Sequence, residues 1–153
     1  ITEATLARLE KKSFDFGRIN FANCDMVGHS GDLEASVTAL SVVDLMLGRL
    51  IEACKKTGYT LVVTADHGNC DEMFLDGDEK SFPQWKELGR GLRPKAKTSH
   101  SLSQVPFYVF EAQKKPRKLL ASGEGRLSQV ASTLLELMEL KGQAHFEPSL
   151  FSS

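Results

Sequence analysis

A chain of 153 residues is long enough for one domain with a sizeable core and too short for a second. Its hydrophobic content of 41% and charged content of 25% are ordinary for a globular protein. Its net charge of −1 excludes a strong positive electrostatic field that would attract nucleic acid or an anionic membrane. No apolar stretch approaches a bilayer span and no signal-peptide pattern opens the sequence. We therefore expect neither a nucleic-acid nor a membrane partner.

The cysteines indicate a cytoplasmic protein. Cys24, Cys54 and Cys70 are odd in number and lack the spacing of a zinc ribbon. Such a set fits a reducing compartment better than a secreted disulfide scaffold.

Apolar periodicity divides the chain into alternating helices and strands. In chain order, we expect a helix at 2–12, a strand at 17–23, a helix from 32 to about 57, strands at 59–65 and 105–111, and a helix at 127–140. This alternation predicts an α/β domain with a largely parallel sheet, and the apolar run at 59–65 predicts burial of that strand on both faces. The polar stretch between Asp71 and Ser99 is interpreted as a solvated loop. Its Trp85 and its cationic run have no assigned role, the run being Arg90, Arg93, Lys95 and Lys97.

Carboxylates and histidines stand at the predicted strand ends. Asp25 and His29 follow the first strand, Asp66 and His67 follow the second, and His100 precedes the third. In parallel α/β sheets, functional groups gather at the carboxyl ends of strands. Carboxylate oxygen combined with imidazole nitrogen suits ions such as Mn²⁺ or Zn²⁺. The pattern therefore predicts a metal site.

The spacing is compatible with two ions. Asp25 and His29 flank a short turn and could reach one ion, with His100 completing its shell. Gly68 permits a sharp turn after the strand, from which the adjacent Asp66 and His67 could reach two separate ions. Two metals about 3.5–4 Å apart are used to clamp a phosphoryl group in transit. Each residue alone also has an ordinary structural interpretation: a helix cap, a turn residue or a surface histidine. Their coincidence at three strand ends favours the metal.

Three segments also resemble a known family. The motifs "NFANCDMVGHSGDLEASVTAL", "VVTADHGNCDEM" and "KTSHSLSQVPFYVF" closely resemble cofactor-independent phosphoglycerate mutase, a branch of the alkaline phosphatase superfamily. The resemblance continues in order to "GRLSQVASTLLELMEL" and so covers almost the whole chain. It implies an alkaline-phosphatase-like three-layer α/β/α sandwich with a mostly parallel sheet. Residues 1–153 would be an incomplete, C-terminal portion of its metal-binding phosphatase domain.

The resemblance also implies an activity and its cofactors. In the family, two divalent ions, most often Mn²⁺, with Mg²⁺, Co²⁺ or Zn²⁺ as other choices, support the interconversion of 3-phosphoglycerate and 2-phosphoglycerate through a phosphoserine. No bisphosphoglycerate cofactor is needed. Asp25, His29 and His100 match the ligands of one ion, and Asp66 and His67 match ligands of the other. The resemblance points to a monomeric enzyme, although a portion of the sheet could associate through an exposed edge.

The chain departs from the family pattern in several places. Cys24 replaces a usual Pro, Cys70 replaces a small residue, and Lys97 replaces the first His of a His-Thr-x-His-Thr motif. The two cysteines are interpreted as small packed residues or, alternatively, as oxidation-sensitive or zinc-capturing groups. Ser30, beside a predicted ligand, does not match the family's nucleophile.

In the family, a nucleophilic serine, a further metal-binding aspartate and an inserted substrate-binding domain complete the active site. No part of this sequence matches these three features. We therefore expect this portion alone to be inactive. Two alternatives remain open: another enzyme of the superfamily, such as a phosphopentomutase or a phosphatase, and a non-catalytic metal-binding module.

Overall fold

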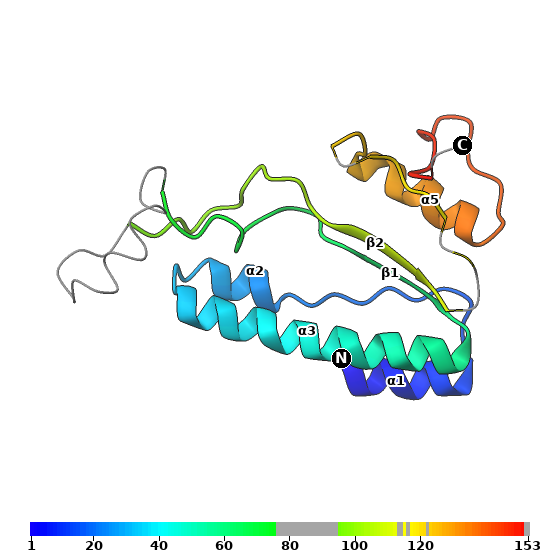
Figure 1. The fold of residues 1–153 in the computed structure, drawn as a ribbon, viewed down its shortest axis with the longest axis horizontal. Coiled ribbons are helices and arrows are strands. Elements are labelled where there is room, and N and C mark those ends of the chain that lie inside the picture. Colours follow the sequence, from blue (N-terminus) through cyan, green and yellow to red (C-terminus); the bar gives the residue numbers. More distant parts are fainter. Residues whose placement is uncertain (76–94, 113–114, 116, 122, 152–153) are drawn as a thin grey trace. The chain divides into compact units, whose positions relative to one another are not determined.

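The computed structural model describes residues 1–75, 95–112, 115, 117–121 and 123–151, in two compact units, Ile1–Gln113 and Lys114–Ser153. Trp85, Arg90 and Arg93, noted in the sequence, lie outside the described residues. Figure 1 traces the elements in chain order. Within the described residues, no helix combines the length and the apolar character needed to cross a bilayer.

Helix α3 (Leu33–Thr57) is the main support of the first unit. Asp32 caps it by accepting a 3.0 Å hydrogen bond from Ala35 N, and Gly58 ends it at a φ of 84° while donating to Cys54 O. Its extent confirms the predicted helix. Helices α1 (Thr2–Lys11) and α2 (Asn23–Gly28) both contact α3.

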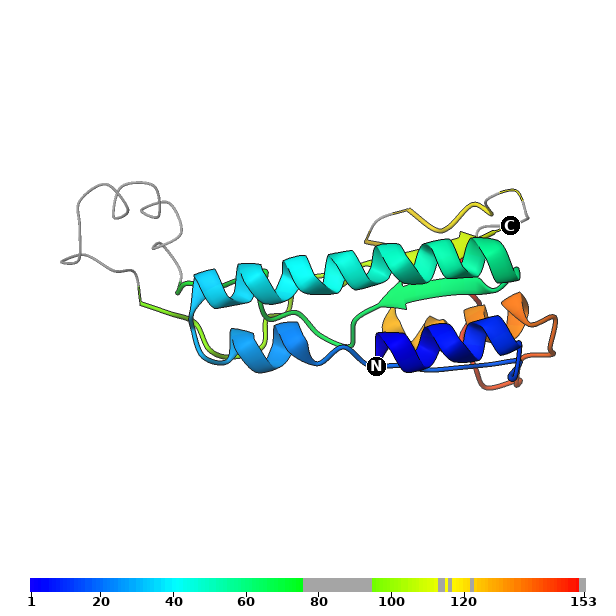
Figure 2. The same ribbon diagram turned by 90° about the horizontal axis from the view of Figure 1, so that it is seen from below.

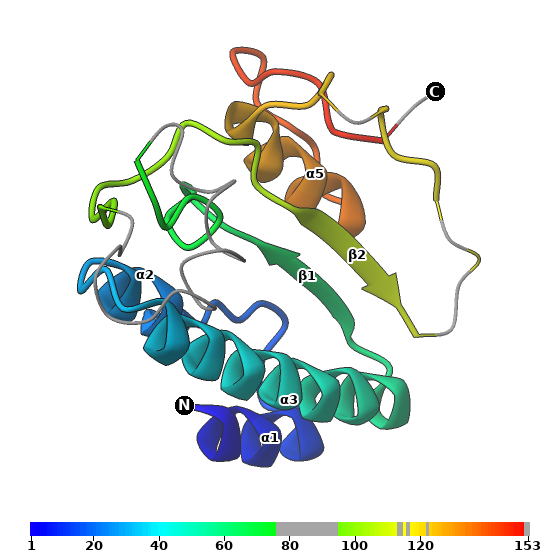
Figure 3. The ribbon, with the colours of Figure 1, turned by 60° about the vertical axis from the view of Figure 1, so that its left-hand side comes forward.

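Strands β1 (Thr60–Thr64) and β2 (Phe107–Glu111) form a two-stranded antiparallel sheet with Thr60 opposite Glu111, visible side by side in Figure 3. The expected parallel orientation is therefore wrong for this pair. A parallel pair needs a crossover connection, usually helical, and the described residues between β1 and β2 contain no helix. β1 is half-buried at its centre and exposed at its ends, so the expected burial on both faces is also wrong within the described structure.

The core of this unit lies where α1, α3 and β1 meet. Its buried members are Leu9, Leu50 and Cys54, and partly buried aromatic residues pack against them: Phe14, Phe21, Tyr59 and Phe110. Phe14 and Tyr59 stack at 5.0 Å between ring centroids. This packing anchors the end of α3 that lies away from α2 (Figure 1).

The predicted strand at 17–23 is wrong. These residues run as a connection without strand pairing from α1 to Asn23, where α2 begins (Figure 2). The β signal came from Ile19 and Phe21. Phe21 packs against the core while Ile19 remains 41% exposed. A strand requires ladder bonds to a neighbour, which apolar composition alone does not provide.

A short backbone ladder joins the two described segments that flank residues 76–94. Leu75 N donates to Lys95 O at 3.0 Å, and Lys97 N donates to Met73 O at 2.9 Å. A side-chain ion pair between Lys97 and Glu72 lies beside it. The ladder holds the approach to His100 next to the segment that follows β1.

The second unit contains a 3₁₀ turn, Leu127–Gln129, that leads into α5 (Val130–Leu137). The predicted helix at 127–140 is confirmed in place but ends three residues earlier, and Glu139 has a φ of 58°, outside helical values. Thr133 is fully buried and accepts a hydrogen bond from Leu150 N at 2.8 Å. This bond fastens the C-terminal segment to α5.

Candidate metal centre

Helix α2 places the first two predicted ligands on one face. Asp25 lies in its first turn and His29 is its C-cap residue, four positions later. Residues four apart on a helix are neighbours. Asp25 Oδ1 and His29 Nε2 are accordingly 3.3 Å apart.

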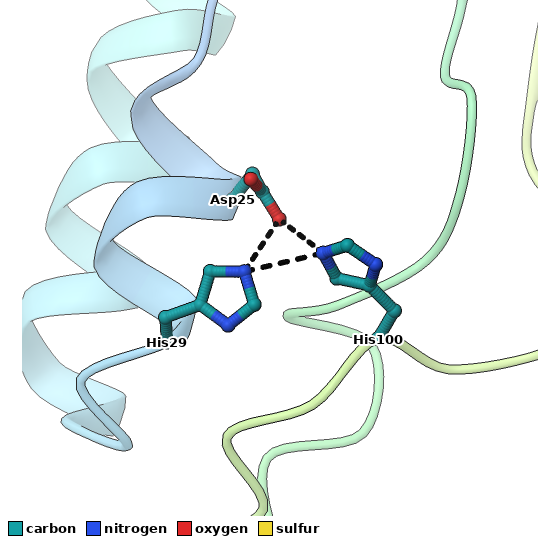
Figure 4. A group of neighbouring side chains, drawn as sticks. All are labelled: Asp25, His29 and His100. Atoms are coloured by element: carbon teal, nitrogen blue, oxygen red, sulfur yellow. Dashed lines mark hydrogen bonds and ion pairs between the residues drawn. The ribbon is translucent and has the colours of Figure 1, made fainter.

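His100 reaches the same point from the segment before β2. Ser101 N donates to Gly68 O at 3.0 Å, and this isolated bridge places His100 opposite α2. Gly68 has no room for a side chain, since a Cβ there would lie 2.1 Å from Ser101 Oγ. His100 Nε2 is 3.1 Å from Asp25 Oδ1 and 3.1 Å from His29 Nε2 (Figure 4).

The three donor atoms suit one divalent ion. Two ligand atoms that each lie about 2.1 Å from an ion are roughly 3.0–3.4 Å apart when the angle between them is between octahedral and tetrahedral values. The separations of 3.1, 3.1 and 3.3 Å fall in that range. Two imidazoles with one carboxylate form a donor set for Mn²⁺, Co²⁺, Fe²⁺ or Zn²⁺. All three side chains are 35–46% exposed, so an ion can reach them from solvent.

Hydrogen bonds outside this triangle orient its members. His29 Nδ1 lies 2.7 Å from Thr98 O, so Nδ1 carries the donated proton and Nε2 presents its lone pair to the cluster. Asn69 Nδ2 donates to Asp25 Oδ1 at 2.9 Å. That hydrogen bond, together with the three nearby imidazoles, lowers the pKa of Asp25 and keeps its carboxylate ionised.

The other two predicted ligands lie beside this cluster. His67 stacks on His100 with ring centroids 3.6 Å apart, and its Nδ1 is 3.9 Å from Asp25 Oδ1. Asp66 is 89% exposed, and its Oδ1 lies 3.7 Å from His67 Nε2. Within the described part of the chain, only Asp25, His29 and His100 bring three donor atoms within 4.8 Å of one another. A second ion at Asp66 and His67 therefore stays a prediction.

Sequence reasoning missed the residues that support the ligands. Asn69 and Thr98 were not singled out, although Asn69 follows the Asp66-His67-Gly68 run directly. Their contacts join segments distant in sequence, so spacing could not reveal them.

The cysteines, Ser30 and Lys97 lie outside the three-residue cluster. Cys70 Sγ donates to Cys24 O at 3.0 Å, and burial, with Cys70 close by, raises the pKa of the Cys24 thiol. Ser30 Oγ donates to Val27 O, and Lys97 pairs with Glu72. Cys24 in α2 and Cys70 in the turn after β1 are both free, partly buried thiols.

Comparison with known protein families shows to which superfamily the chain belongs. The Metalloenzyme superfamily matches residues 1–142. The chain belongs to this superfamily. Membership of a superfamily of metal-dependent enzymes is consistent with the cluster of possible metal ligands that α2 and the segment before β2 form.

Relatives within the superfamily confirm the resemblance seen in the motifs. A probable 2,3-bisphosphoglycerate-independent phosphoglycerate mutase from Leptospira interrogans is 39% identical over 153 residues, covering 100% of this chain and 27% of that protein. The 2,3-bisphosphoglycerate-independent phosphoglycerate mutase of Trypanosoma brucei is 38% identical over 152 residues, covering 98% and 27%. The chain thus spans about a quarter of the length of these relatives.

A solved structure supports the fold. Leishmania mexicana phosphoglycerate mutase, crystallised at low cobalt concentration, matches 99% of this chain and 27% of its own, with a TM-score of 0.82 and 33% identity. The alkaline-phosphatase-like α/β class is thereby confirmed, with a small sheet as expected for an incomplete portion of that fold.

Proposed function

We propose that this chain is the C-terminal portion of the metal-binding domain of a cofactor-independent phosphoglycerate mutase, an isomerase that interconverts 3-phosphoglycerate and 2-phosphoglycerate. The observation that carries the proposal is the convergence of Asp25, His29 and His100 in a chain similar over its length to proteins named for that activity. In the intact enzyme the phosphoryl group passes through a phosphoserine. Under this proposal the intact enzyme is a cytoplasmic monomer.

Each ligand has a defined task in this proposal. Asp25 supplies an anionic oxygen that balances the charge of a divalent ion, while His29 and His100 supply neutral nitrogens. The bound ion would neutralise phosphoryl charge and lower the pKa of an oxygen nucleophile. Mn²⁺ is the ion we favour, because two nitrogens disfavour Mg²⁺. Asp66 and His67 would serve a second ion together with donors from outside this sequence.

The substrate would be a small phosphoglycerate, and the chain alone should not convert it. No residue here matches the family's nucleophile or its substrate clamps. Incubation of the purified chain with Mn²⁺ and 3-phosphoglycerate should therefore give no 2-phosphoglycerate. Turnover by the purified chain would contradict this part of the proposal.

A chimera tests the mutase assignment directly. The Leptospira interrogans protein aligns with all 153 residues, so this chain can replace the matching segment. We expect the chimera to interconvert the two phosphoglycerates without bisphosphoglycerate and to stop when the metal is chelated. Asp25→Asn should abolish conversion, whereas Asp15→Asn, at an exposed position in the connection after α1, should not.

The other outcomes identify the alternatives. A folded chimera that binds Mn²⁺ and hydrolyses phosphate esters without forming 2-phosphoglycerate would favour a phosphatase. A folded chimera that binds Mn²⁺ at these residues and acts on no phosphate ester would favour the non-catalytic module.

A further inference from the structure

A buried amide, Asn69, lies directly behind the exposed metal cluster. Asn69 is only 7% exposed, and its Nδ2 donates both to Asp25 Oδ1 at 2.9 Å and to Asp25 O at 3.3 Å. One amide group thus binds the main chain and the side chain of the same ligand. Two such bonds restrict the rotation of the Asp25 carboxylate about its side-chain bonds.

Asn69 reaches Asp25 because Gly28 has no side chain. Gly28 is a buried residue of α2, and a Cβ on it would lie 2.4 Å from Asn69 Oδ1 and 2.8 Å from Asn69 Cγ. Any larger residue would push the amide away from the helix. The glycine and the amide therefore form one fitted contact between α2 and the turn after β1.

The other end of the amide has an energetic cost. Asn69 Oδ1 is buried and accepts no hydrogen bond among the described residues. An unsatisfied buried acceptor costs about 1–3 kcal/mol. Turning the amide over would bring its oxygen against the Asp25 carboxylate, which only accepts hydrogen bonds when ionised. An apolar side chain of similar size would avoid the cost, so the benefit of an amide here lies in its bonds to Asp25.

We propose that Asn69 is a positioning residue of the metal centre, which fixes Asp25 Oδ1 toward His29 and His100 before an ion binds. This inference rests on the metal centre in the proposed function. A donor already held in place loses less conformational freedom when the ion arrives, so the ion binds more tightly. Partners that orient metal ligands typically contribute about 10- to 100-fold to metal affinity.

The test compares Asn69→Leu with Asn20→Leu in the 153-residue chain. Leucine branches at Cγ as asparagine does but neither donates to Asp25 nor leaves an unsatisfied oxygen, and Asn20 is an exposed control. Three quantities are measured: Mn²⁺ affinity by calorimetry, the metal-free melting temperature, and the Asp25 side-chain rotamer from metal-free NMR couplings. For Asn69→Leu we expect about 10- to 100-fold weaker Mn²⁺ binding, an unchanged or higher melting temperature, and an averaged Asp25 rotamer. Asn20→Leu should resemble the unsubstituted chain.

Gly28→Ala provides a second route to the same contact. Its methyl group should displace Asn69 and weaken Mn²⁺ binding on its own. Because both substitutions break one contact, the double variant should bind no more weakly than the weaker-binding single variant. Gly28→Ala also keeps the proposal testable should Asn69→Leu fail to fold.

Two results would overturn the inference: unchanged Mn²⁺ affinity in Asn69→Leu, or a loss of affinity matched by an equal loss of metal-free stability. Should the unsubstituted chain bind no Mn²⁺, the proposed metal centre fails separately. The rotamer measurement then decides the positioning role. A single Asp25 rotamer that averages only in Asn69→Leu supports it, and an unchanged rotamer refutes it.

Discussion

The Asp25–His29–His100 cluster and the Asp66–His67 pair use the same kinds of side chain, yet only the cluster brings three donor atoms together in the described structure. In the cluster, the spacing of α2 fixes two donors and the Gly68–Ser101 bridge brings the third. Asp66 instead lies just past the end of β1 with its side chain 89% exposed.

The difference shows that supporting contacts distinguish an assembled site from a group of suitable residues. His29 is hydrogen-bonded to Thr98 O and Asp25 is hydrogen-bonded to Asn69, so each side chain has a fixed orientation before an ion binds. In the pair, His67 stacks on His100, but the carboxylate of Asp66 is held among the described residues by His67 alone, at 3.7 Å. A second site here would need a further donor to fix Asp66.

The largest expected effect is the loss of the assembled site. His100→Ala removes one of three donors, and because even the partners of ligands contribute 10- to 100-fold, we expect Mn²⁺ affinity to fall more than about 100-fold. Calorimetry measures this, with His145→Ala, in the second unit, as the control. Retained affinity in His100→Ala would show that the three residues do not act together.

The next effect concerns the bridge that carries His100. Gly68→Ala would place a Cβ 2.1 Å from Ser101 Oγ and 2.6 Å from Asp71 Oδ1, so we expect about 1–3 kcal/mol lower free energy of unfolding. Urea denaturation measures the change. Gly48→Ala is the matched control, since its Cβ would meet nothing within 4 Å in α3, and it should stabilise by about 0.5–1 kcal/mol. Equal effects at the two glycines would argue against a close-packed bridge.

Substitution in the pair should matter less. Asp66→Asn removes an exposed charge whose one ion-pair partner among the described residues is His67, so Mn²⁺ affinity should change less than about fivefold. We expect about one ion per chain before and after the substitution. A stoichiometry of two that falls to one in Asp66→Asn would show that the pair is also assembled in this chain.

The smallest effect is a pH dependence beside the cluster. Hydrogen bonds from Lys97 and then Ser103 lower the pKa of Glu72, although Asp71 opposes this. A lowered pKa in the folded state stabilises the fold above the unfolded value of about 4.3, and this contribution is lost as the pH falls through the folded value. Glu72→Gln should therefore be slightly less stable at pH 7, and the difference, followed by urea midpoints, should shrink as the pH falls through the lowered pKa of Glu72. A difference that grows toward low pH would reverse the assigned sign.

Local signals in the sequence predicted α1, α3 and the position of α5, but they missed the short helix α2. Asp32 and Gly58 mark the ends of α3 by cap chemistry that depends only on nearby residues, and both act as expected. The candidate ligands could also be named from the sequence, because metal binding requires particular side chains, and the structure brings three of them together. The resemblance of the chain to a known family, which the comparisons confirm, also implied that Asp25, His29 and His100 group around one ion.

Contacts between distant segments were beyond this reasoning. Whether 17–23 pairs as a strand, and whether β1 and β2 run antiparallel, depends on which segments become neighbours rather than on composition. Asn69 escaped notice for the same reason, since its importance arises only where Gly28 lets it approach Asp25.

The backbone ladder between Met73–Leu75 and Lys95–Lys97 makes the geometry of the metal centre independent of the number of residues that connect Leu75 to Lys95. Its two hydrogen bonds fix both ends of the segment 76–94, and His100 follows three residues beyond the ladder. The entropy cost of closing a loop between two fixed points rises by only about 0.6 kcal/mol for each doubling of loop length. A reporter peptide or a small domain inserted between residues 76 and 94 should therefore leave the metal ligands in register, which makes this segment a practical attachment point.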